Sequence, residues 1–359
     1  MPNWDKLWYQ DRIVLWPLIP LSFIYASIVK LRRKWYQLQA FLKKSFFSAN
    51  SNPVIPVIVV GNITIGGTGK TPLVIHIAEY LIERGWQPGI ISRGYRGKHR
   101  KPTAVNSKSD PKIVGDEALL FAKHLECPVV VGKNRSKALK KLLKLNPKQA
   151  LNAIDVVISD DGLQHYALER HIEIAVVDAQ RRFGNGYCLP VGPLREPESR
   201  LSVVNLIIYN TGAFYGMPEK AIPKNEDENA KDYSTNAYKM GYVPGKLYNA
   251  FQTDRQASLA TFRGQTVHAI AGIGNPERFF QLLTDYGLIV IKHAFPDHHH
   301  FTHKDIYFRN EFPVIMTEKD AVKCTKFVDL RHWILPIKAE VDLQFDAKLL
   351  ALLEGQYYG

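Results

Sequence analysis

A glycine-rich segment at residues 60–73, VGNITIGGTGKTPL, constrains the fold of this chain more than any other feature. It follows an apolar run, PVIVVGN, and precedes a stretch of helical periodicity at residues 72–84 that stops at Gly85. A strand, a glycine loop and a helix in this order hold phosphate, because backbone N–H groups and the helix N-terminus point at its oxygens. The sequence therefore predicts a nucleotide-binding α/β domain.

The loop supplies most of the pattern G-x-x-x-x-G-K-[ST]. Thr64 stands where the first glycine is usual, which removes some backbone freedom but no phosphate ligand. We predict that residues 64–71 bind ATP: Thr64, Ile65, Gly66, Gly67, Thr68, Gly69, Lys70 and Thr71. Lys70 is expected to reach the β- and γ-phosphates, and the Thr71 hydroxyl to meet Mg²⁺. The alternative is a glycine-rich turn with a structural role only.

Apolar runs alternate with helical stretches along the rest of the chain, which is typical of a parallel sheet covered on both faces. We expect an α/β fold of the P-loop NTPase type, with a doubly wound, mostly parallel sheet in residues 51–230. A polar surface excursion is expected near residues 212–232. A smaller α/β domain follows at residues 231–359, with its last strand predicted at residues 332–341. The tetrapeptide at 317–320, TEKD, has glutamate where a guanine-specific N-K-x-D needs lysine, and we interpret it as a surface turn.

The first 50 residues predict a membrane-associating helix. Ile13 to Val29 contains no charged residue, and Lys30 to Lys44 contains six basic residues and no acidic one. As a helix, the uncharged run is about 26 Å long, shorter than the ~30 Å hydrocarbon core of a bilayer. Pro17 and Pro20 weaken a spanning helix further. A helix packed on the protein's own core and a single transmembrane span are the alternatives.

The charge and cysteine content narrow the choice of partners. The chain carries a formal net charge of +13, which favours anionic partners such as nucleic acid, an anionic membrane or a phosphorylated substrate. The basic block adjoins an apolar run instead of spreading over a groove, so we expect no nucleic-acid partner, and no obligate protein partner is evident. The 3 cysteines form no C-x-x-C pair, which argues against a disulfide scaffold and favours a reducing cytoplasm.

Carboxylates and histidines supply the remaining chemistry. Asp160 and Asp161 end an apolar strand, where adjacent carboxylates are costly unless a cation such as Mg²⁺ neutralises them; a pair of solvated loop aspartates is the alternative. Asp116, Asp178 and the histidine-rich segment at residues 295–303 are candidates for activating an acceptor hydroxyl. A metal site among these histidines lacks supporting ligands, and a single histidine acting on a proton fits as well.

The ordered series of motifs resembles the tetraacyldisaccharide 4′-kinase family over nearly the whole chain. The matching pieces are GNITIGGTGKTP, SRGYRG, VGDEALL, VVVGKNR, ISDDGLQHYALERHIEIAVVD, RRFGNGYCLPVGPLREP, AGIGNPERFF, FPDHHHFT and VIMTEKDAVKC. Threonine at the loop entrance also occurs in that family. The resemblance implies transfer of the ATP γ-phosphate, with Mg²⁺, to the 4′-hydroxyl of an acylated glucosamine disaccharide 1-phosphate lipid, giving lipid IVA. It further implies a peripheral or monotopic enzyme on the cytoplasmic face of the inner membrane.

The resemblance also implies roles for single residues. It makes Asp116 the carboxylate that activates the acceptor and His298 its partner, although His299 and His300 leave this alignment open by one position. It makes Asp160, Asp161 and Glu117 the metal or active-site carboxylates. It assigns substrate contacts to Arg93, Arg135, Gln164 and His165, and it places Arg195 and Glu196 near the nucleotide.

Two other functions belong to different classes. A membrane-associated regulatory NTPase of the partition type has a lysine at the position of Ile65. A nucleic-acid-binding ATPase distributes basic and aromatic residues over a groove-forming domain. The sequence has neither feature and favours the lipid kinase.

Overall fold

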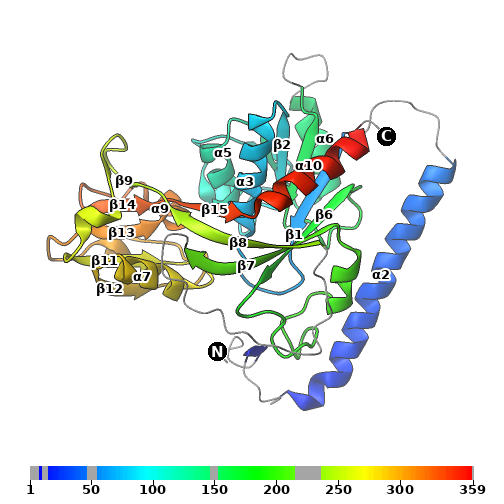
Figure 1. Cartoon of the computed structure of the whole chain (residues 1–359), viewed down its shortest axis with the longest axis horizontal. Helices are drawn as coiled ribbons and strands as arrows, with labels where there is room; N and C mark the ends of the chain where they lie inside the picture. The colour runs from blue at the N-terminus through cyan, green and yellow to red at the C-terminus, as the bar shows by residue number, and fades with distance from the viewer. Residues whose placement is uncertain (1–7, 10–14, 47–54, 146–152, 215–235, 358–359) are drawn as a thin grey trace.

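Two sheets organise the chain in a computed structural model that describes residues 8–9, 15–46, 55–145, 153–214 and 236–357 (Figure 1). The larger sheet is parallel except for its two edge strands, β15 and β3, which run antiparallel to their neighbours. Its order is β15 (Ile337–Val341), β8 (Ala237–Pro244), β7 (Leu206–Phe214), β6 (Ile172–Asp178), β1 (Val57–Gly61), β5 (Val156–Asp160), β2 (Pro88–Ser92), β4 (Val129–Val131) and β3 (Thr103–Val105). The predicted doubly wound, mostly parallel sheet is confirmed.

Helices cover both faces of the larger sheet because its central strands are apolar on both sides. In β1, Ile58 and Val60 belong to one buried cluster, and Val57 and Val59 belong to the other. The first face is covered by α3 (Lys70–Glu83), α5 (Asp116–His124) and α10 (Leu343–Tyr357), and the second by α6 (Arg135–Leu145) and part of α2 (Ile19–Phe46). The short α4 (Pro111–Val114) leads into α5, and a 3₁₀ helix, η2, spans Glu198–Val203.

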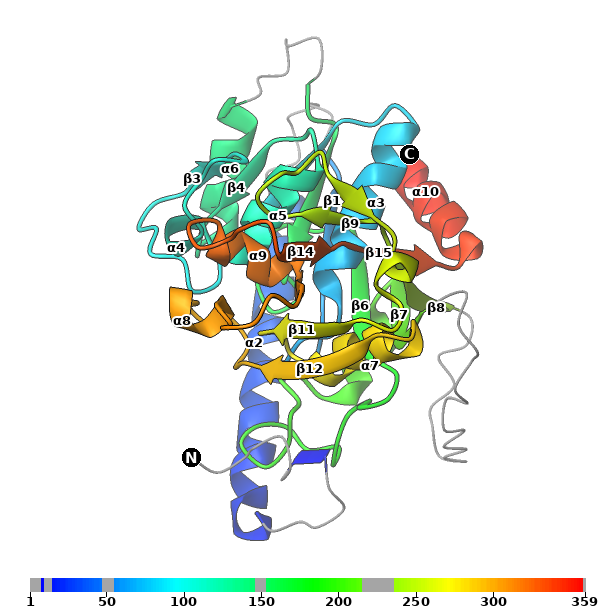
Figure 2. The same cartoon turned by 90° about the vertical axis from the view of Figure 1, so that its left-hand side faces the viewer.

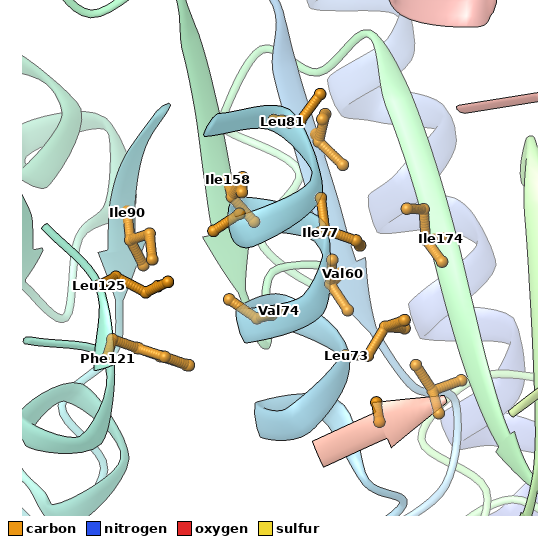
Figure 3. Packing of buried hydrophobic residues seen from close by; sticks show 14 of the residues in the cluster. Val60, Leu73, Val74, Ile77, Leu81, Ile90, Phe121, Leu125, Ile158 and Ile174 are labelled. Atoms are coloured by element: carbon orange, nitrogen blue, oxygen red, sulfur yellow. The ribbon is translucent and has the colours of Figure 1, made fainter. Parts of the chain in front are cut away.

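Helix α3 follows the glycine loop and fixes it to the core. Leu73, Val74, Ile77 and Leu81 recur at helical spacing and are fully buried against the central strands (Figure 3). Each such side chain contributes about 1.5–3 kcal/mol by leaving water. The N-terminus of α3 is therefore held rigidly at the carboxyl end of β1.

The smaller sheet carries the second domain. Its order is β10 (Gln256–Ala257), β9 (Leu247–Asn249), β14 (His332–Leu335), β13 (Val314–Thr317), β11 (Thr266–Ala271) and β12 (Ile289–Ala294). Its helices are α7 (Pro276–Asp285), α8 (His303–Ile306) and α9 (Glu318–Cys324), with a 3₁₀ helix, η4, at Leu259–Phe262. Figure 2 shows α9 beside α5, and the two helices pack together between the domains.

The run at residues 332–341 forms two strands where one was predicted. Its first part, β14, belongs to the smaller sheet and its second part, β15, pairs with β8 in the larger sheet. Pro336 separates them, since it has no N–H to donate to a continuing ladder. The C-terminal α10 also packs on the first domain, so the two sheets divide the chain differently from the expected boundary at residue 230. The predicted polar excursion lies mostly outside the described residues.

The N-terminal region forms one long helix, α2, preceded by a short 3₁₀ turn, η1 (Trp16–Leu18). Figure 1 shows α2 along one side of the molecule, with the smaller sheet on the other. One face of α2 packs on the protein: the Ser22 hydroxyl donates to the Cys188 carbonyl at 2.7 Å, and Tyr25 donates to the Arg195 carbonyl at 3.3 Å. Among the described residues no helix combines the length and the apolar character needed to cross a membrane.

Candidate active site

The glycine loop curls between β1 and α3 as the sequence predicts. Gly69 has a φ of 88°, and a Cβ there would lie 2.4 Å from both the Asn210 amide nitrogen and the Tyr242 hydroxyl, so only glycine fits. Asn210 donates to the Thr68 carbonyl at 2.9 Å, which fixes the loop from β7. The Thr68 hydroxyl is buried and finds no hydrogen-bond partner among the described residues, as expected of a loop shaped to receive a polar ligand.

The entrance of the loop is pinned to the segment PLREP. Thr64 is buried and forms an antiparallel bridge with Leu194, and the Ile65 N–H donates to the Pro193 carbonyl at 2.8 Å. The first two of the predicted nucleotide-binding residues therefore hold the loop in place. The backbone N–H groups of residues 66–71 are the part of the loop suited to contact a phosphate.

Lys70 lies between two acceptors near the loop. Its ammonium is 3.1 Å from the Asn62 side-chain oxygen and 3.3 Å from the Asp161 carboxylate, which Arg195 also approaches at 3.4 Å. Burial raises the pKa of Asp161, but the charges of Lys70 and Arg195 outweigh burial and lower it to about 2. Asp161 is thus an anion already paired with two cations.

Asp160 is less fully compensated than Asp161, although Lys70 also lowers its pKa. It is fully buried and accepts a hydrogen bond from the Ser92 hydroxyl at 2.8 Å. Burial, followed by the nearby charges of Glu117 and Asp161, raises the pKa of Asp160 to about 7. A divalent cation at this position would relieve that cost. Asp160 is therefore better suited to metal binding than Asp161, because its charge is less fully matched.

Asp116 and His298 come together across the two domains. The Nδ1 atom of His298 lies 2.8 Å from Oδ2 and 3.1 Å from Oδ1 of Asp116, and both side chains are buried. Asp116 begins α5 behind Gly115, whereas His298 follows β12 in the second domain. Burial raises the pKa of Asp116, but the hydrogen bond from His298 and the charges of Lys319 and Lys323 lower it to about 2.

The three consecutive histidines have different surroundings. His299 lies 3.3 Å from Asp305, the residue that completes the capping box of α8, and His300 is exposed. Arg96 donates to the carbonyls of Asp297 and His298 at 3.2 and 3.3 Å, which holds the backbone of the segment. The predicted proximity of His298 to Asp116 is confirmed. Of the three consecutive histidines, His298 is the one that contacts Asp116.

The predicted substrate residues divide into two groups. Arg135 is buried and donates to the Gly132 carbonyl at 3.0 Å and the Asp160 carbonyl at 2.8 Å, so its guanidinium supports the backbone that carries the carboxylates. Gln164 donates to the Asn62 carbonyl at 2.9 Å and to Glu196 at 2.8 Å, which links the carboxylate loop, the glycine loop and PLREP. Arg93 is exposed at the end of β2.

His165 lies among positive charges. Burial, followed by the charges of Arg135, Arg170, Arg32 and Arg93, lowers the pKa of His165 to about 4. Its Nε2 accepts from the Arg135 N–H at 3.3 Å, which requires a neutral imidazole. A set of cations on one side of the carboxylates suits an anionic group of a substrate.

We expect the change His165→Gln to make stability less sensitive to acid. The pKa of His165 falls from 6.5 in the unfolded chain to about 4 in the fold, so between these values only the unfolded chain binds the proton. The contribution of His165 to stability is complete above the unfolded value and is lost as the pH falls through this window. Between neutral pH and pH ~5, Tm measured by thermal unfolding should decrease less in the variant than in the wild type. Equal decreases would contradict the assignment.

Several site residues were missed by the sequence analysis, above all in TEKD. This tetrapeptide is not a surface turn: Asp320 is fully buried, and the Thr317 side chain accepts from the Asp320 N–H as the N-cap of α9. The signal was present, since Thr-x-x-Asp after an apolar run marks the start of a helix. The cap turns Lys319 towards Glu117 and Asp297, at 3.3 and 3.1 Å.

A cavity of about 230 Å³ lies beside the glycine loop, between the two domains. Its walls include Lys70, Thr71 and Glu117 from the first domain and Arg278 and Lys319 from the second. Within the described ranges, no three His, Cys, Asp or Glu side chains are grouped to hold a metal by themselves.

The chain is similar to known proteins over nearly its whole length. The protein-family model described as tetraacyldisaccharide-1-P 4′-kinase matches residues 14–354. Proteins named tetraacyldisaccharide 4′-kinase are similar over most of their length: that of Methylobacillus flagellatus is 44% identical over 97% of this chain and 95% of its own, and that of Nitrosococcus oceani is 42% identical over 97% and 94%. A crystal structure of LpxK from Aquifex aeolicus in complex with ATP superposes with a TM-score of 0.71 at 26% identity, covering 95% of this chain and 99% of that one.

Proposed function

The chain belongs to the tetraacyldisaccharide-1-phosphate 4′-kinase family, and from this premise we propose how its residues divide the reaction. It is an ATP-dependent kinase that phosphorylates the 4′-hydroxyl of a lipid A disaccharide precursor. The observation that carries the proposal is the contact between Asp116 and His298, which joins the two domains beside the cavity of the glycine loop.

ATP lies with its phosphates on the glycine loop in this proposal. The N–H groups of residues 66–71 and the N-terminus of α3 surround the β- and γ-phosphates, and Lys70 neutralises their charge. The chemistry of the donors supports a bound Mg²⁺, because Asp160 is a buried carboxylate whose pKa is raised to about 7 in the absence of a cation. Thr71, Asp160 and Glu117 would hold the ion, with Asp161 oriented nearby by Lys70; bound Mg²⁺ neutralises phosphate oxygens.

Asp116 acts as the base towards the acceptor. It accepts the proton of the 4′-hydroxyl, the hydroxyl oxygen forms a bond to the γ-phosphorus, and the bond from that phosphorus to the β,γ-bridging oxygen breaks. ADP leaves with the electron pair of the broken bond. His298 donates from Nδ1 to Asp116, so it orients the carboxylate that receives the proton.

The disaccharide approaches from the side where Gln164, His165 and the arginines lie. Arg32 of α2 and Arg93, which directly follows β2, both influence His165 electrostatically, so α2 and the first domain contribute cations to one region. A lipid that carries a 1-phosphate supplies the matching negative charge. We assign Arg93, Gln164 and His165 to substrate contacts on this basis, and Arg135 to support of the carboxylate loop.

The outer face of α2 supports docking on the cytoplasmic face of the inner membrane. Large apolar side chains are exposed along it beside basic residues: Leu21, Phe23, Ile24, Ile28, Leu31, Trp35, Leu38, Phe41 and Leu42. Apolar insertion and attraction of the basic residues to anionic headgroups reinforce each other, at about 1 kcal/mol for each Lys or Arg near the surface. We therefore propose a peripheral or monotopic enzyme that takes its lipid from the bilayer.

Four substitutions on this face are expected to release the protein from vesicles. The combined change Leu31→Gln, Trp35→Gln, Leu38→Gln and Phe41→Gln removes exposed apolar area but keeps helix propensity and charge. Flotation with phosphatidylglycerol–phosphatidylethanolamine vesicles should show strong loss of binding, while ATP affinity stays unchanged. Deletion of α2 is a poorer test because it also removes the contacts of Ser22 and Tyr25 with the first domain.

Exposed apolar residues elsewhere provide the matched control. Ile113→Gln, Phe251→Gln, Ile289→Gln and Leu330→Gln change the same number of exposed side chains away from α2, and this variant should float like the wild type. Undiminished flotation of the α2 variant would show that the membrane contact lies elsewhere.

An assay with labelled ATP, Mg²⁺ and the disaccharide 1-phosphate lipid in detergent tests the proposed function. The label should appear on the lipid, and product analysis should place the new phosphate on the 4′-oxygen. The Asp116→Ala variant should bind ATP but leave the lipid unlabelled. Hydrolysis of ATP that is independent of the lipid, with no labelled lipid, would instead favour a regulatory NTPase.

A further inference from the structure

Lys319 makes three contacts at the point where the two domains meet. Its ammonium lies 3.3 Å from Oε1 of Glu117 and 3.1 Å from Oδ1 of Asp297. The third contact, at 3.4 Å, is with Nε2 of His298. Glu117 belongs to α5 of the first domain, whereas the other residues belong to the second domain. Lys319 therefore bridges the two domains beside the reacting groups.

We propose that Lys319 is a positioning residue for phosphoryl transfer, which holds Glu117 and His298 in one arrangement across the domain boundary. This inference rests on the proposed function. Side chains from different domains are not held at a fixed distance by a common helix or strand. A side chain that contacts both domains can fix that distance. A misplacement of about 1 Å in such a site costs about 10²-fold in rate.

The contacts fix the imidazole of His298 from both ends. An ionised Asp116 carboxylate only accepts hydrogen bonds, so Nδ1 is a donor towards it. An ammonium only donates, so Nε2 accepts from Lys319. Asp297 also lies 3.5 Å from Nε2, and Lys319 pairs with that carboxylate. The ring of His298 is therefore held between an acceptor, Asp116, and a donor, Lys319.

The charge of Lys319 also compensates a crowded set of carboxylates. Asp116 is buried and Glu117 and Asp297 are partly exposed, and these three carboxylates surround Lys319, where like charges repel. The ammonium of Lys319 supplies the positive charge that offsets them, at 3.3 Å from Glu117 and 3.1 Å from Asp297.

The neighbouring Lys323 does not duplicate these contacts. It lies one turn further along α9, pairs with Asp320 at 2.8 Å and approaches Asp116 only to 3.9 Å. Among the described residues, Lys323 makes no hydrogen bond or ion pair with Glu117 or His298. The bridging geometry is thus specific to Lys319.

The change Lys319→Met is expected to lower kcat by about 10–100-fold and to change the KM for ATP by less than about threefold, because the glycine loop still holds the nucleotide. Lys319→Arg keeps a charged donor and should recover kcat to within about tenfold of the wild type. Lys326→Met removes an exposed charge at the end of α9 and should leave both constants unchanged. Thermal unfolding checks folding, and Lys319→Gln replaces the Met variant if that one is unfolded.

A spectroscopic measurement separates this inference from the proposed function. The ¹⁵N resonances of the His298 ring, assigned by their loss in His298→Gln, should shift at Nε2 in Lys319→Met but not in Lys326→Met. A kcat within about threefold of the wild type in Lys319→Met, or equal losses in the Arg and Met variants, would overturn the positioning role. If the wild type transfers no phosphate to the lipid, the proposed function fails; an unchanged Nε2 resonance would independently show that Lys319 does not hold His298.

Discussion

Lys70→Ala is expected to lower kcat by about 10²–10³-fold, because the variant loses the cation that stabilises charge on the γ-phosphate. The structure holds this ammonium in place with Asn62 and Asp161, at 3.1 and 3.3 Å, at the start of a helix whose buried face is fixed in the core. Thr71→Ala should lose activity on a similar scale, since Thr71 supplies a hydroxyl to Mg²⁺. Single-turnover kinetics and equilibrium ATP binding distinguish lost chemistry from lost affinity.

A lysine on the same domain provides the control for this prediction. Lys137 is exposed on α6, and Lys137→Ala removes one positive charge without touching the loop, so its turnover should match the wild type. Turnover close to wild type in Lys70→Ala or Thr71→Ala would remove the loop from the mechanism. Restored binding of ATP at high Mg²⁺ in Thr71→Ala alone would support the separate roles of the two side chains.

The sequence predicted the parts of the fold that local chemistry determines. The strand β1 is a continuous apolar run because both its faces are covered, and such runs are recognisable without knowledge of their partners. The glycine loop was recognisable because a phosphate-binding turn needs glycine at positions such as Gly69, where the fold leaves no room for a Cβ. Asp116 and His298 were paired through the family resemblance, and the structure brings them to 2.8 Å.

Features that depend on how distant segments of the chain pack together were harder to predict from the sequence. Residues 332–341 look like one strand because the apolar pattern continues through Pro336, yet the two halves enter different sheets. The family resemblance implies a substrate contact for Arg135, whereas in the structure its guanidinium donates to the carbonyls of Asp160 and Gly132. Lys319 faces the site only because α9 packs beside α5, which no local pattern encodes.

The Asp116–His298 pair should give the most informative variants. Asp116→Ala and His298→Ala are each expected to lower kcat by about 10²–10⁴-fold, the usual contribution of a general base, while ATP affinity changes little. Asp116 is a weak base because its pKa is lowered to about 2, in part by the hydrogen bond from His298, so its value lies in the position in which His298 holds it. His299→Ala is the matched control, since His299 lies against Asp305 and outside the pair.

The double variant decides whether the two residues act as one unit. If His298 serves only through Asp116, the variant that lacks both should be scarcely slower than the slower single variant, because the second change removes a group whose target is already absent. If the losses multiply, His298 contacts the reaction on its own, for example at the acceptor or the γ-phosphate. The contact from Nδ1 to both carboxylate oxygens, with Nε2 turned to Lys319, favours the first outcome. In that arrangement both ring nitrogens are already engaged, which favours Asp116 as the group that receives the proton of the 4′-hydroxyl.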